Sequence, residues 1–72
     1  MANILEKEIS SLEKKISTIS MKVEENMNNA VNALIKNDTN IAKQVIKDDN
    51  IIDNLEIEVE EKCLKILALH QP

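Results

Sequence analysis

The chain has 72 residues, a formal net charge of −4, and neither an aromatic residue nor a glycine. This length allows one small domain, and the missing aromatics and glycines argue against strands and tight hairpin turns. The acidic balance disfavours nucleic acid as a partner, and because no apolar run reaches the length of a membrane span, we expect the chain to be peripheral to a membrane at most.

The first predicted element is a helix over about residues 3–36. From Leu5 to Val23 the apolar residues recur at alternating steps of four and three, which is typical of a coiled-coil seam. The seam is then expected to pass through Met27, Ala30 and Leu34, with a step of four on each side of Val23. Two such steps in succession predict a local unwinding of the supercoil.

The second predicted element is a helix over about residues 39–70, after a turn at residues 37–38. Asn37 tolerates the left-handed conformation that ends a helix, and Asp38 or Thr39 can cap the next one. A break this short makes neighbouring helices antiparallel. The sequence therefore predicts an all-α fold, an antiparallel two-helix hairpin.

Both predicted helices carry more apolar residues than one seam can use. Because a hairpin covers one stripe per helix, the extra rows would be exposed without a partner. We therefore expect either a homo-oligomer, in which self-association completes a four-helix bundle, or a part of a longer bundle. The extra rows are Val31 and Ile35 in the first helix, and Ile46, Ile57, Leu64 and Leu67 in the second.

The candidate ligands are acidic residues of the second helix. Asp49, Asp53, Glu56 and Glu60 fall within a narrow arc that flanks the apolar stripe. Carboxylates at Asp49 and Asp53 repel each other on a helix, and holding a cation is a common use for such a pair. The alternative is a solvated acidic face. Asp48 falls near the middle of the stripe, either paired there or at a local opening of the bundle.

The sequence contains no pattern of residues typical of an enzyme active site. His70 is the only histidine and residue 67 is a leucine, so the Glu-x-x-His pair of di-iron helical bundles is absent. The helix-one serines have no base beside them. The single Cys63 lies on the apolar stripe as a core residue, and a lone thiol is compatible with a reducing cytoplasm.

Several segments from residue 23 onward form an ordered pattern, namely residues 23–27, 30–34, 37–38, 41–46, 49, 52–56 and 66–72. The features that are specific together are, in order, the Asn37-Asp38 turn, Val45-Ile46, the Asp-x-x-Ile-Asp-x-Leu-Glu series from Asp49, and the closing Gln71-Pro72. With this series the chain resembles the first repeat of PhoU, a family of bacterial regulators of phosphate uptake.

The resemblance implies a fold and a site. PhoU proteins contain two similar three-helix bundles, so residues 1–72 would be a truncated PhoU-like hairpin that holds the first two helices of the first bundle. The family carries a metal-binding motif, Glu or Asp followed four residues later by Asp. Asp49 and Asp53 match this motif and Glu56 lies beside it. The implied cofactor is iron or another divalent or trivalent metal ion.

The resemblance also implies a role and a location. PhoU proteins dampen phosphate uptake and the phosphate-starvation response by contacting a phosphate ABC transporter and a sensor histidine kinase on the cytoplasmic side. The leading hypothesis is therefore a metal- and protein-binding regulator in the cytoplasm. The alternative is a purely structural, self-associating coiled-coil hairpin without metal. A carboxylate-bridged di-metal enzyme is disfavoured because the histidine ligands are missing.

Overall fold

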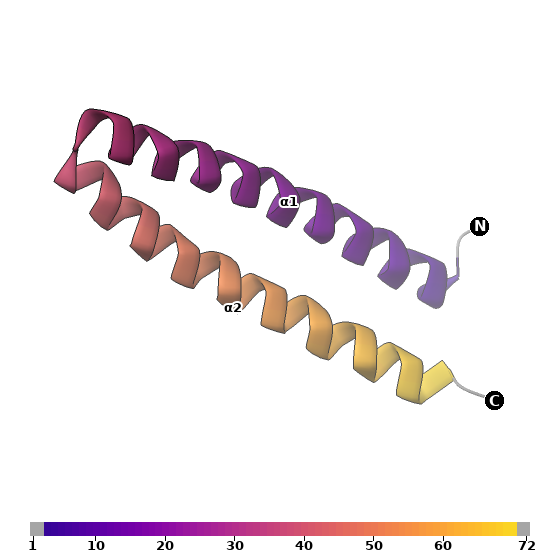
Figure 1. Ribbon diagram of the computed structural model, residues 1–72. Helices are drawn as coiled ribbons and strands as arrows, with labels where there is room; N and C mark the ends of the chain where they lie inside the picture. The colour runs from indigo at the N-terminus through magenta and orange to yellow at the C-terminus, as the bar shows by residue number, and fades with distance from the viewer. Residues whose placement is uncertain (1–2, 71–72) are drawn as a thin grey trace.

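A computed structural model describes residues 3–70, which form two α-helices and no strand. Helix α1 comprises Ile4–Lys36 and helix α2 comprises Thr39–His70. The helices lie side by side and antiparallel, joined at one end of the molecule (Figure 1). The predicted all-α hairpin is confirmed. Gln71 and Pro72, which contribute to the family resemblance, lie outside the described residues.

The turn reverses the chain without a glycine. Asn37 has φ 50° and ψ 44°, the left-handed conformation that asparagine tolerates better than most residues. The next backbone N–H, of Asp38, donates to the Ala33 carbonyl at 3.0 Å. This bond satisfies one of the carbonyl groups that the end of α1 would otherwise leave without a partner. The Asp38 side chain then accepts from the backbone N–H groups of Asn40 and Ile41 and caps α2.

The seam of α1 continues its rhythm of four and three beyond Val23, so the predicted interruption after Val23 is wrong. Of the predicted seam residues before Val23, Ile9 and Ile16 are 43% and 48% exposed. Beyond Val23 the buried residues of α1 are Asn26 and Ala33, whereas Met27 and Leu34 are 65% and 83% exposed. Steps of three, four and three from Val23 lead to residues 26, 30 and 33, which keeps the same face against α2. The larger apolar side chains consequently face away from the seam.

The core of the hairpin is thin. Only four apolar side chains within residues 3–70 are buried, namely Leu12, Ala33, Ile52 and Ile66. The six side chains of the two extra rows are between 51% and 75% exposed. The hairpin therefore leaves most of its large apolar side chains in contact with solvent, as the width of the apolar stripes predicted.

The solvent-accessible surface area also indicates that the hairpin leaves much of its surface uncovered. It measures 6040 Å² for a chain of 8.1 kDa. A compact folded protein of this mass exposes roughly 4,500 Å². The excess, about 1,500 Å², is large compared with the roughly 800 Å² that each partner buries in a standard protein interface.

Neither helix, over residues 3–70, is long and apolar enough to cross a membrane.

Candidate functional site

The hairpin presents two chemically different sides, one on each flank of the seam. We call one the apolar–acidic side, because its grooves are bordered by Met27, Leu34, Ile46, Asp49 and Glu56. We call the other the polar side, because its grooves are bordered by Lys22, Glu25, Asn29, Asn32, Lys36, Gln44 and Asp48.

The three predicted metal ligands are exposed residues of α2. Asp49 borders a groove with Val23 and Met27, and Glu56 borders the next groove, again with Met27. Asp53 is exposed on the same helix, one turn beyond Asp49. Within residues 3–70, no three His, Cys, Asp or Glu side chains are grouped closely enough to hold a metal ion. A metal ion at this position would therefore need oxygen donors from another helix or another chain.

The half of the seam nearer the turn contains a buried polar residue, Asn26 of α1, which is 8% exposed. Its Nδ2 donates a hydrogen bond to the backbone carbonyl of Val45 in α2, at 3.0 Å. Since a carbonyl can only accept, this contact fixes which way the amide lies. The other amide atom, Oδ1, is buried and has no hydrogen-bond partner among the described residues.

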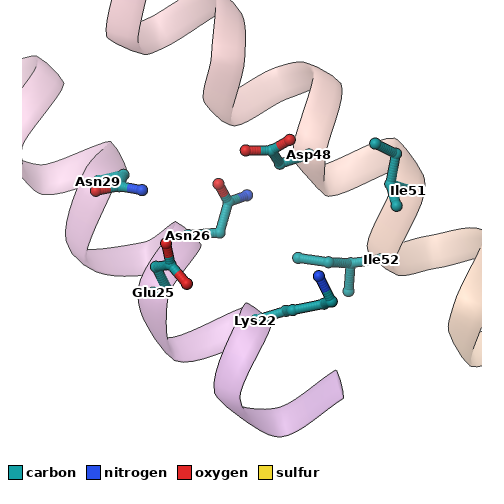
Figure 2. A pocket seen from close by; sticks show the side chains of 7 residues that line it. All are labelled: Lys22, Glu25, Asn26, Asn29, Asp48, Ile51 and Ile52. Carbon is teal, nitrogen blue, oxygen red and sulfur yellow. The ribbon is translucent and has the colours of Figure 1, made fainter. Parts of the chain in front are cut away.

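A cavity of about 150 Å³ adjoins Asn26 on the polar side (Figure 2). Glu25 and Asn29 of α1 and Asp48 of α2 line it, with Lys22 as the cationic lining residue. Asp48 is half-buried and accepts a hydrogen bond from Gln44 Nε2 at 2.9 Å on Oδ1. Of the two alternatives that the sequence left open for Asp48, the local opening describes its surroundings better.

Asn26 is the polar residue that the sequence interpretation missed. The available signal was the spacing, because a step of three from Val23 reaches Asn26 and continues the rhythm of the preceding seam. Cys63 is half-buried, which agrees only in part with a core position, and His70 is the exposed last residue of α2.

These features define an all-α helical-bundle module with one side left open. Residues 16–72 match the family model described as the PhoU domain. Because this match covers more than half of the chain, the chain belongs to the PhoU family.

Curated relatives support the same assignment. The chain is 35% identical over 66 residues to the "Phosphate-specific transport system accessory protein PhoU homolog" of Aquifex aeolicus, covering 92% of this chain and 30% of the relative. It is 31% identical over 65 residues to the PhoU protein of Escherichia coli (90% and 27%), and 46% identical over 50 residues to the homolog of Pseudomonas aeruginosa (69% and 21%).

The chain thus spans less than a third of the length of these relatives. A comparison with solved structures found no significant match.

Proposed function

We propose that this chain acts, without catalysis, in the regulation of phosphate uptake as an accessory protein of a phosphate transport system. The observation that carries this proposal is the match of residues 16–72 to the PhoU domain. The curated relatives are named accessory proteins of a phosphate-specific transport system, which supports the same role.

The proposed partners are a phosphate ABC transporter and a sensor histidine kinase, contacted in the cytoplasm, as the family resemblance implies. The apolar–acidic side supports a binding role, because Leu34 and Ile46 are 83% and 65% exposed there. Exposed apolar surface of this extent is typical of protein interaction sites.

The chain is also proposed to associate with a second copy of itself. The excess accessible surface of about 1,500 Å² exceeds what one partner buries in a standard interface. A second hairpin that packs on the apolar–acidic side would form a four-helix bundle and bury the two extra rows.

The proposed metal site would be completed by this self-association. Asp49 and Glu56 border the grooves that a second copy would cover, and Asp53 lies one turn from Asp49. Carboxylates of the partner would then supply the donors that one hairpin lacks. Iron, or another divalent or trivalent ion, accepts such oxygen ligands.

The alternative function is a purely structural, self-associating hairpin that binds no metal. The observation that favours it is that residues 3–70 contain no group of three potential ligands of the His, Cys, Asp and Glu types. Under this alternative the acidic residues serve solubility alone.

Phosphate uptake by cells tests the regulatory role. The host is a bacterium whose own PhoU gene has been deleted, and it expresses the chain or one of two variants. Leu34→Glu places a charge on the apolar–acidic side, and Asn32→Glu places the same charge on the polar side of the same helix. We expect the chain and Asn32→Glu to lower the initial uptake rate, and Leu34→Glu to lose this effect. An uptake rate that the unaltered chain does not change would contradict the proposal.

A further inference from the structure

The buried oxygen of Asn26 is the feature that the proposed function leaves unexplained. The amide nitrogen is committed to the Val45 carbonyl at 3.0 Å, and the oxygen lacks a partner within residues 3–70. A buried acceptor without a donor destabilises the folded state. A bound species that interacts with this oxygen would therefore stabilise the hairpin.

The surroundings of Asn26 are rich in oxygen atoms. Glu25 and Asn29 of α1 and Asp48 of α2 line the same cavity, and Figure 2 shows Asp48 extending from α2 towards Asn26 and Asn29. The Asp48 carboxylate retains acceptor positions after it accepts from Gln44, because its two oxygens carry about four lone-pair sites. Oxygen ligands for a bound cation would thus come from both helices.

The charge and size of the cavity decide the class of ligand. Two carboxylates against one ammonium group give the lining an excess of negative charge, which disfavours an anion. Hard divalent cations take carboxylate, side-chain amide and water oxygens, and Ca²⁺ accepts six to eight of them at about 2.3–2.6 Å. A volume of about 150 Å³ has room for such an ion together with several waters, since one water occupies roughly 30 Å³ in the liquid.

We propose that the cavity between α1 and α2 is a binding site for a hard divalent cation, with Asn26 Oδ1 and the Asp48 carboxylate as ligands from the two helices. Glu25 and Asn29 supply further oxygens, and waters complete the coordination. The bound ion links the helices in the half of the seam nearer the turn. This site lies on the polar side, uses neither Asp49 nor Asp53 as a ligand, and does not depend on the proposed function. Asn26 also borders the groove of Asp49 on the other side of the seam.

Calorimetric titration of the full chain with CaCl₂, and separately with MgCl₂, tests the site. Asp48→Asn removes one charge from the cavity, and Asp49→Asn removes the same charge from the neighbouring residue on the apolar–acidic side. We expect Asp48→Asn to weaken binding about tenfold or more, and Asp49→Asn to leave the affinity of this site within about twofold. Binding that Asp48→Asn does not change, or that only the acidic pair supports, overturns the proposal.

Thermal melting gives a second test, which does not require a binding affinity to be measured. We expect Ca²⁺ to raise the melting temperature of the chain and to raise that of Asn26→Leu less, because leucine supplies no oxygen to the ion. An equal rise in the two chains overturns the assignment of Asn26 as a ligand. Asn26→Leu places an apolar side chain with the same number of heavy atoms in the seam and is expected to fold. If the cavity holds only water, neither Ca²⁺ nor Mg²⁺ will change the melting temperature of the unaltered chain. This result overturns the proposal.

The ammonium group of Lys22 provides a test with the opposite sign. A cation in the cavity is repelled by Lys22, so Lys22→Met should tighten Ca²⁺ binding by about two- to sixfold. Lys36→Met removes an equal charge from a different groove of the polar side and should change the affinity less. Weaker binding in Lys22→Met overturns the assignment of the ion to this cavity.

Discussion

Asn26 of α1 and Val45 of α2 are joined across the seam by a side-chain-to-backbone hydrogen bond of 3.0 Å. A polar residue at a core position of a coiled coil fixes the register of the helices at some cost in stability. Here the cost is visible in the Oδ1 of the same side chain, which has no hydrogen-bond partner within residues 3–70. Sliding α2 along α1 would break this bond.

The first prediction concerns this cost. In the absence of divalent cations, Asn26→Leu should raise the free energy of unfolding by about 1 kcal/mol, because it removes this buried acceptor and keeps the same number of heavy atoms. Urea denaturation at a fixed chain concentration measures the change. Asn28→Leu, at an exposed position, is the control and should stay within about 0.5 kcal/mol. A less stable Asn26→Leu would show that the bond to Val45 outweighs the unpaired oxygen.

The second prediction uses two adjacent isoleucines. Ile52 is 5% exposed in the seam, whereas Ile51 is 48% exposed beside the polar cavity. Ile52→Ala should lower the free energy of unfolding by about 2–4 kcal/mol through lost burial and a cavity. Ile51→Ala should cost less than about 1 kcal/mol. Urea denaturation compares the two, and equal losses would refute the placement of the seam in α2.

The hairpin itself could be predicted from local signals. Asn37 and Asp38 stand between two long apolar stripes, and both residues act at the turn as their side chains suggest. The seam after Val23 is harder to predict, because Met27 and Leu34 are larger and more apolar than Asn26 and Ala33, and only the rhythm of the preceding steps favours Asn26. In this hairpin the largest apolar side chains of that segment, Met27 and Leu34, face solvent. Choosing the seam by side-chain size therefore gives the wrong residues.

The candidate sites were predictable to different extents. The exposure of Asp49, Asp53 and Glu56 follows from their place at the flank of the stripe. Whether they hold a metal depends on donors from elsewhere, which the spacing within one helix cannot show. The cavity beside Asn26 depends on which residues of α2 lie opposite α1, so it required the register of the two helices.

The third prediction concerns self-association. Leu64→Glu should shift the chain from dimer to monomer, because it places a charge on an outward apolar row that the second copy would bury. Asn54→Glu introduces the same charge at an exposed polar position of α2 and should leave the dimer intact. Sedimentation equilibrium measures the mass. A folded monomer for the unaltered chain at all concentrations would refute the proposed bundle.

The fourth prediction concerns the acidic pair. Asp49→Asn combined with Asp53→Asn should weaken Fe³⁺ or Mn²⁺ binding about tenfold or more, because both substitutions remove anionic oxygen donors. Glu58→Gln combined with Glu61→Gln changes the net charge equally at exposed positions elsewhere on α2 and is the control. Calorimetry at constant ionic strength measures the affinities. Equal binding by both double variants would leave only a general attraction between cations and an acidic chain.

Asn26 and the polar residues beside it divide the apolar contacts of the seam into a shorter stretch near the turn and a longer one beyond it. One stretch reaches the turn and is closed by the covalent connection through Asn37, whereas the other, with Leu12 and Ile66, runs towards the ends of the helices that no turn joins. The second stretch can fray without disturbing the first, since opening costs only its own burial. Amide hydrogens in residues 4–20 and 56–70 should consequently exchange with solvent deuterium sooner than those near the turn.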